Sequence, residues 1–153
     1  MNLTTRLTRN RPAYRTYDYL VNHYVYLVAR GLVMTQLNQE RCVACRRDSP
    51  SVTDAEVAQM KPELPDWEMF AEDDIPKLGR VFKLKNFQQA LDFTNQLGSL
   101  AEDQGHHPRL ITEWGRVQVT WWTHKIRNLH RNDFVMAAKS DQVYQTYENA
   151  RQE

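Results

Sequence analysis

The side chains of this chain best suited to catalysis belong to three histidines in its last third. They are His106, His107 and His124, and they stand in a frame with Glu102 and Asp133. Histidine has an unperturbed pKa of roughly 6.5, so it can take up or release a proton near neutral pH. Several histidines brought together therefore indicate acid-base catalysis, in which a positioned group transfers a proton to or from the substrate.

A long helix is predicted directly before the histidine pair. Asn86 is a suitable N-cap and Gly105 a suitable C-terminal stop. Pro108 disfavours helical geometry at His107, so both histidines should lie in a short loop with little freedom. Between these caps, mainly apolar residues recur at spacings of three and four. They predict one stripe along the helix that is suited to cover a sheet: Phe87, Ala90, Leu91, Thr94, Leu97, Leu100 and Ala101.

Two strands are predicted after this loop, over residues 110–114 and 116–124, with a turn at Gly115. Side chains alternate along a strand, so Val117, Val119 and Trp121 should face one way and Trp122 and His124 the other. His124 is therefore expected at a strand end on the more polar face. Trp122 shares that face and is expected in the wall of a pocket.

Three further elements follow from local signals in the rest of the chain. Residues 53–56 form a capping box that should begin a short helix, ending near Lys61. Apolar alternation over 67–71 and 78–84 predicts a β-hairpin around a turn at 72–76. Asn132 and Asp133 should open a final helix with a weaker stripe, composed of Phe134, Ala137, Ala138 and Tyr144.

The order of these elements predicts an α+β fold. Helix, two strands, helix, two strands, helix is the pattern of a four-stranded antiparallel sheet with about three helices packed on one face. Such a layer leaves one sheet face and an edge uncovered, which favours self-association as a homodimer or homotetramer.

Length and composition favour a single folded domain. The chain has 153 residues, of which 41% are hydrophobic and 25% charged. Residues 1–33 differ from the rest, with five arginines against one acid. We expect residues 34–153 to form the domain. Residues 1–33 are expected to be a mobile or weakly helical extension, either a transit segment or the product of a start upstream of Met34.

Charge and hydropathy argue against two classes of partner. A formal net charge of +1 gives no overall field that would attract nucleic acid. The apolar run over residues 24–33 is broken by Arg30 and is too short to span a membrane.

Cys42 and Cys45 are too few for a disulfide scaffold or a four-thiolate metal site, so free thiols in a reducing cytoplasm are expected. A redox pair or half of a metal site remains the alternative for them.

The spacing from Glu102 through His106-His107-Pro108, Trp114 and His124 to Asp133 resembles the signature of the pterin-4a-carbinolamine dehydratases, in their bacterial branch. The resemblance extends from about residue 42 to about residue 144 and leaves out residues 1–33. Two positions depart from it. Many members carry an acid at the place of Gly105, and some carry glutamate at the place of Lys125. Either change could alter histidine pKa values or pterin affinity, and neither removes a proton-transfer group.

This resemblance implies a hydro-lyase that dehydrates 4a-hydroxy-tetrahydropterin to quinonoid dihydropterin. The reaction supports tetrahydrobiopterin recycling for the aromatic amino-acid hydroxylases, and so phenylalanine metabolism, and it needs no metal or other cofactor. By the family pattern the catalytic residues are His106, His107 and His124, with His106 and His124 the main proton-transfer pair. The remaining assignments are Pro108, Trp122, Thr123 and Lys125 as pterin contacts, and Glu102 and Asp133 as supports of the histidines.

Two other functions stay open. The histidines and an acid could hold a metal in a hydrolase, although adjacent side chains of an extended loop diverge. Animal members of the family also serve without catalysis, as dimerisation cofactors of a transcription factor, and contact with an aromatic amino-acid hydroxylase is a further expected interaction. His130 is expected at the surface.

Overall fold

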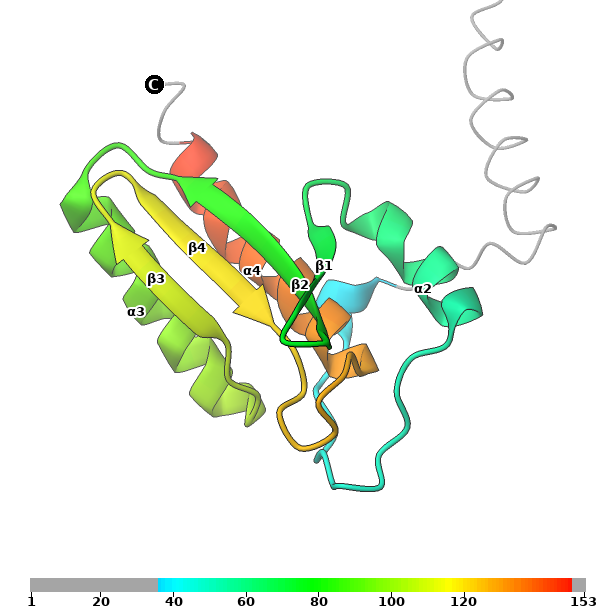
Figure 1. Ribbon diagram of the computed structural model, residues 1–153. Coiled ribbons are helices and arrows are strands. Elements are labelled where there is room, and N and C mark those ends of the chain that lie inside the picture. Colours follow the sequence, from blue (N-terminus) through cyan, green and yellow to red (C-terminus); the bar gives the residue numbers. More distant parts are fainter. Residues whose placement is uncertain (1–35, 150–153) are drawn as a thin grey trace, which may run out of the picture. The chain divides into compact units, whose positions relative to one another are not determined.

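A computed structural model describes residues 36–149 of the chain (Figure 1). The extension predicted over residues 1–33 lies outside these residues. Within them, no helix is long and apolar enough to cross a membrane. The elements in chain order are η1 (Leu37–Gln39), α2 (Asp54–Met60), η2 (Lys61–Glu63), β1 (Glu68–Glu72), β2 (Ile75–Lys83), α3 (Phe87–Gln104), β3 (Arg109–Glu113), β4 (Arg116–Trp121) and α4 (Arg131–Asn149).

The four strands form one antiparallel sheet in the order β1-β2-β4-β3. Helices α3 and α4 lie on the same side of it (Figure 1), and α2 adds Met60 and Val57 to the same core. The predicted α+β fold is therefore confirmed. On β4 the predicted inward residues Val117, Val119 and Trp121 are all buried, and Thr120 between them is fully buried as well.

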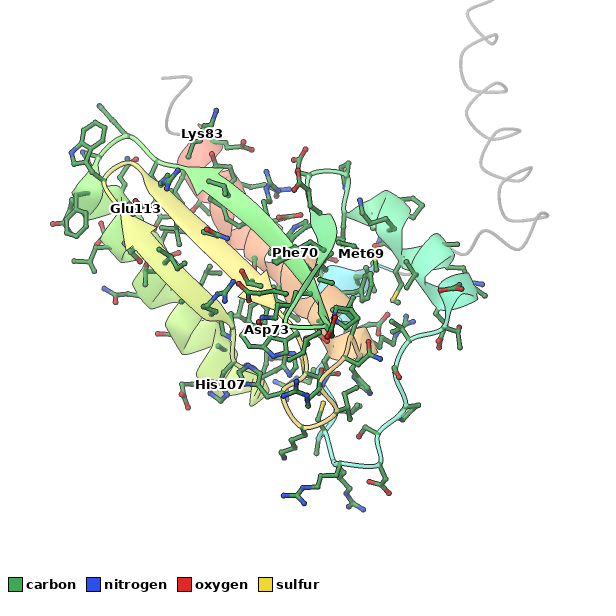
Figure 2. All side chains as sticks on the ribbon, in the orientation of Figure 1. Met69, Phe70, Asp73, Lys83, His107 and Glu113 are labelled. Carbon is green, nitrogen blue, oxygen red and sulfur yellow. The ribbon has the colours of Figure 1, made fainter. Side chains whose placement is uncertain are left out.

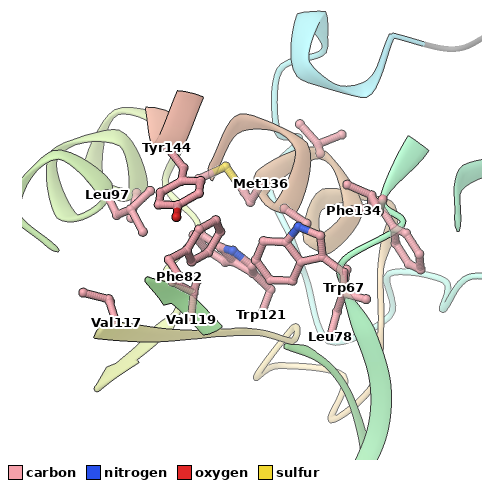
Figure 3. Packing of buried hydrophobic residues seen from close by; sticks show 14 of the residues in the cluster. Trp67, Leu78, Phe82, Leu97, Val117, Val119, Trp121, Phe134, Met136 and Tyr144 are labelled. Carbon is pink, nitrogen blue, oxygen red and sulfur yellow. The ribbon is translucent and has the colours of Figure 1, made fainter. Parts of the chain in front are cut away.

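The core lies between the sheet and the two long helices (Figure 3). Phe82 of β2 lies at its centre, with its ring centroid 4.9 Å from those of Phe93 and Tyr144 and 5.8 Å from that of Trp67. Phe93 comes from α3 and Tyr144 from α4, so one aromatic cluster joins both helices to the sheet. Burial of large aromatic side chains supplies much of the free energy that holds such layers together.

Helix α3 has the predicted ends. The side chain of Asn86 accepts a hydrogen bond from the backbone N–H of Gln89, and Gly105 ends the helix with a φ of 61°. The predicted stripe is wrong in part, because Phe87 and Leu91 are exposed. The buried face is instead centred on four residues with helical spacing, which include one that the prediction left out: Ala90, Phe93, Leu97 and Ala101.

The β1–β2 hairpin exists, but its turn is shorter than the predicted 72–76. Asp73 and Asp74 alone connect the strands, and both have positive φ, at 53° and 58°. Aspartate tolerates this left-handed geometry better than most residues, and the primed two-residue turn matches the twist of a hairpin. Pro76 lies inside β2, where the strand is not yet paired with β4, because that pairing starts at Leu78.

Strand β4 ends at Trp121, so the prediction of a strand to residue 124 is wrong. The neighbouring strands offer no partner beyond this point, since the last pairs are Leu78 with Trp121 and Arg109 with Thr120. The chain turns instead, and Thr123 forms an isolated bridge with Asn128. His124 thus lies in the turn after the strand.

Candidate active site

The loop after α3 and the turn after β4 meet at one end of the sheet, because β3 and β4 are antiparallel neighbours. Figure 2 shows His107 at this end, with Lys83 and Glu113 at the opposite end. A cavity of about 180 Å³ is present here, which we call the histidine cavity. It is lined by Cys45, Gly105, His106, His107, Thr123, His124 and Lys125. All three predicted catalytic histidines therefore meet in one place.

His106 is held by a buried carboxylate. Its Nε2 lies 2.6 Å from Oδ1 of Asp133, which is itself fully buried. A carboxylate only accepts, so Nε2 carries the proton and, in the neutral ring, Nδ1 carries the lone pair. The ring also stacks on Trp121, with centroids 5.7 Å apart and planes 12° apart. Together these contacts fix the orientation of the imidazole.

Asp133 makes two further contacts through its other oxygen. Oδ2 accepts hydrogen bonds from the Thr123 hydroxyl at 2.9 Å and from the backbone N–H of His130 at 2.7 Å. The residue stands in the first turn of α4, where the helix dipole stabilises a negative charge. One carboxylate thus links the loop after α3, the turn after β4 and the start of α4.

His107 points to a different carboxylate. Its Nε2 lies 3.0 Å from Oε1 of Glu102, and both side chains are exposed. The rings of His106 and His107 therefore diverge, as expected for neighbours in an extended loop. Among residues 36–149, no group of three histidine, cysteine or acidic side chains is arranged to hold a metal ion.

His124 stacks on Trp122. The ring centroids are 4.2 Å apart and the planes differ by 10°. Partial burial, and next the nearby His106, lower the pKa of His124 below its usual value. Because the proton is lost more readily, the neutral ring that can act as a base persists to lower pH.

The four predicted pterin contacts divide into two pairs. Thr123 and Lys125 line the histidine cavity, and Nζ of Lys125 donates to the backbone carbonyl of Cys45 at 2.8 Å. Pro108 and Trp122 are not among the lining residues. Because β4 stops at Trp121, strand alternation does not carry Trp122 into the cavity wall, and its ring packs behind His124 instead.

The sequence prediction left Cys45 out of the site. The residue lines the cavity, and its sulfur accepts a hydrogen bond from Nδ2 of Asn132 at 3.2 Å. Both cysteines are free, and burial raises the pKa of Cys45 and that of Cys42, the latter to about 12. Both thiols are therefore protonated at neutral pH. The Cys-x-x-Cys spacing was a signal, but it did not say that the loop carrying it reaches the histidines.

His130 is buried, so its predicted place at the surface is wrong. The residue directly precedes α4, and its Nδ1 accepts a hydrogen bond from the backbone N–H of Asn132 at 3.1 Å. The ring acts as the helix N-cap in the way that a serine or asparagine side chain usually does. Burial lowers the pKa of His130, which keeps the accepting nitrogen free of a proton.

The fold and the site together describe an α+β domain with a three-histidine cavity at one end of its sheet. Residues 50–143 match the family model described as pterin 4 alpha carbinolamine dehydratase. The chain belongs to this family.

Individual relatives agree with the family model. A Nitrosococcus oceani protein, provisionally named a pterin-4-alpha-carbinolamine dehydratase, is 54% identical over 110 residues, which cover 72% of this chain and 97% of the relative.

Two solved structures are also similar. One is described as a transcriptional coactivator/pterin dehydratase from Brucella melitensis. It has a TM-score of 0.56 at 29% identity, covering 62% of this chain and 99% of that one. The other is a pterin dehydratase-like protein identified as a RuBisCO assembly factor in the alpha-carboxysome. It has a TM-score of 0.44 at 21% identity, covering 52% of this chain and 92% of that one.

Proposed function

We propose that this protein is a hydro-lyase that removes water from 4a-hydroxy-tetrahydropterin and releases quinonoid dihydropterin. The observation that carries the proposal is the meeting of His106, His107 and His124 in one cavity of a chain from this family. The reaction requires one group that accepts a proton and one that donates it, and histidine can do either near neutral pH.

In the proposed mechanism His124 is the base and His106 the acid. Neutral His124 takes the proton from N5 of the pterin, and the electrons of that bond form the C4a–N5 double bond. The C4a–oxygen bond breaks as His106 protonates the departing hydroxyl, which leaves as water. Asp133 favours this role because its hydrogen bond to Nε2 holds the ring of His106 in one orientation, which leaves Nδ1 for the substrate. His107 would hold the substrate or assist the leaving hydroxyl.

The substrate contacts proposed besides the histidines are Thr123 and Lys125, which line the cavity, together with Pro108 and Trp122, each of which directly adjoins a lining residue in the sequence. Glu102 and Asp133 would orient His107 and His106, to which they are hydrogen bonded. We further propose a cytoplasmic role in pterin recycling for an aromatic amino-acid hydroxylase.

Site-directed variants test this assignment. His106→Ala and His124→Ala should each lower kcat for dehydration of chemically generated 4a-hydroxy-tetrahydropterin by on the order of 10²- to 10⁴-fold. Glu113→Gln, at the far end of the sheet (Figure 2), is the control and should retain wild-type kcat. Alanine variants as fast as the wild type would show that the histidines are wrongly assigned.

A second proposed function is binding without catalysis, as a dimerisation cofactor of a transcription factor or of a hydroxylase. Its support is the description of the Brucella melitensis relative as a coactivator. Such binding should survive His106→Ala, because that substitution removes a group of the cavity and leaves the helical surface intact. A partner that binds the wild type and loses affinity for this variant would count against a separate binding role.

A further inference from the structure

A buried cation lies behind the candidate active site. Lys77 of β2 is 4% exposed, and its Nζ lies 4.4 Å from the centroid of the Trp122 ring. The last pair of β2 and β4 is Leu78 with Trp121, so the register brings Lys77 and Trp122 together one step beyond it. A cation over an indole ring at this distance is attracted by the negative face of the π-system.

Trp122 is also the ring on which His124 stacks, with centroids 4.2 Å apart. The same indole therefore contacts Lys77 and His124. This makes a continuous path of packed side chains from Lys77, near the start of β2, through Trp122 to the histidine cavity. Lys77 does not line the cavity, so any effect that it has on the reaction would pass through Trp122.

An ion-pair cluster fixes the position of Lys77. Its Nζ is paired with Oε2 of Glu72, which also accepts from Nη1 of Arg109 at 2.8 Å. The Arg109 guanidinium lies 5.8 Å from the Trp122 centroid. Hydrogen bonds from Arg109 and then Lys77 hold the pKa of Glu72 at about 2, so the carboxylate stays ionised. Two cations and one carboxylate leave one net positive charge beside Trp122.

We propose that Lys77 is a positioning residue, which holds Trp122 and through it the ring of His124, and whose charge disfavours a second positive charge on that ring. The catalytic consequence rests on the proposed function, in which neutral His124 accepts the N5 proton. Besides Lys77, the groups that act on the charge of His124 are His106 and His107, which oppose protonation, and Asp133, which favours it.

The direct test is the titration of His124 by NMR, with its ring signals assigned from a His124→Gln spectrum. Lys77→Met should raise the pKa of His124 by about 0.5 unit, because a charge several ångströms away is removed. Lys83→Met is the matched control, since it removes the same charge from the same strand at the end far from His107 (Figure 2). It should leave the His124 titration unchanged.

A second variant should shift the pKa of His124 in the opposite direction. Glu72→Gln leaves the two cations without their carboxylate, so the pKa of His124 should fall by a similar amount. Glu72 is partly exposed, so this substitution tests the charge even where Lys77→Met does not fold. A His124 titration that matches wild type in folded Lys77→Met, or that does not fall in Glu72→Gln, overturns the inference.

Dehydratase kinetics then separate this inference from the proposed function. In Lys77→Met the acidic limb of kcat/KM should move to higher pH with the NMR titration. An unmoved pKa in a variant with dehydratase activity overturns the role of Lys77 and leaves the proposed function intact. A moved pKa in a protein without dehydratase activity overturns the proposed function and leaves the coupling of Lys77 to His124 intact.

Discussion

At the scale of single residues, Asp133 is the side chain on which the site depends most. It is fully buried and binds His106, the Thr123 hydroxyl and the N–H that precedes α4. Its position in the first turn of a helix gives a sufficient structural reason for an acid. Its three contacts indicate a second role, which is to hold the segments of the site together. Each contact comes from a segment that bears or flanks a cavity residue.

Asp133→Asn should damage both stability and activity. An amide has one accepting and one donating end. Either its NH₂ group would face the two donors that now bind Oδ2, or His106 would have to change tautomer to accept from it. We expect the free energy of unfolding to fall by about 1–3 kcal/mol, measured by urea denaturation, and kcat to fall on the order of 10²-fold. Glu102→Gln is the stability control, since that exposed side chain should change the free energy by less than about 0.5 kcal/mol. Equal losses in both variants would contradict the special place of Asp133.

The sequence alone could predict which residues carry chemistry, and only part of how they are arranged. Spacing and alternation predicted that His106 and His107 follow a helix end and that His124 stands near a strand end, because helix and strand periods are local properties. The resemblance to the family then implied that the three share one pocket. Spacing and alternation could not predict that Trp122 packs behind His124. That depends on where β4 stops pairing, and this is fixed by the lengths of β2 and β3.

At the scale of elements, the start of α4 is unusual because a histidine caps it. His130→Ala should lower the free energy of unfolding by about 1 kcal/mol at neutral pH, since the N–H of Asn132 loses its acceptor. His130→Asn should largely restore it, because asparagine is a strong N-cap. Urea denaturation of the three proteins measures the difference. An alanine variant as stable as wild type would contradict a capping role.

The same residue should make stability depend on pH. The pKa of His130 is lower in the folded than in the unfolded protein. The unfolded chain therefore takes up its proton first as pH falls, and stability is lost below the unfolded pKa of roughly 6.5. His130→Asn should lose less stability than wild type between about pH 7.5 and about pH 5.5. Some loss should remain, because the pKa of His124 is shifted in the same direction. An undiminished loss would contradict this account.

The β1–β2 hairpin offers a test by stabilisation. Its turn residues Asp73 and Asp74 both have positive φ, and Asn-Gly is the preferred pair for such a turn. The double variant Asp73→Asn with Asp74→Gly should raise the free energy of unfolding by roughly 0.5–1 kcal/mol, as measured by urea denaturation. A decrease would show that the aspartate side chains make a contribution that the turn geometry does not explain.

The presence of each helix and strand is easier to predict from the sequence than the residue at which it ends. The caps Thr53, Asn86 and Gly105 act locally, and the structure confirms all three. The hairpin turn and the end of β4 were misplaced, since they depend on pairing with residues distant in the sequence. The exposed Phe87 and Leu91 were assigned to the buried stripe because periodicity cannot tell which flank of a helix the sheet covers.

At the scale of the whole molecule, one face of the sheet is left without a helix (Figure 1). Val81 and Ile111 on that face are exposed, at 48% and 41%, as is Trp114 at 73% in the turn between β3 and β4. These side chains support the prediction of a homodimer or homotetramer. Sedimentation equilibrium should therefore give a multiple of the chain mass. A monomer at every concentration up to the solubility limit would contradict it.

The central claim is that the histidine cavity dehydrates a pterin, and one rate tests it most directly. The measurement is the decay of chemically generated 4a-hydroxy-tetrahydropterin, followed by absorbance with and without the wild-type protein. We predict a decay that accelerates in proportion to protein concentration and yields quinonoid dihydropterin. A decay no faster than in buffer would contradict the claim.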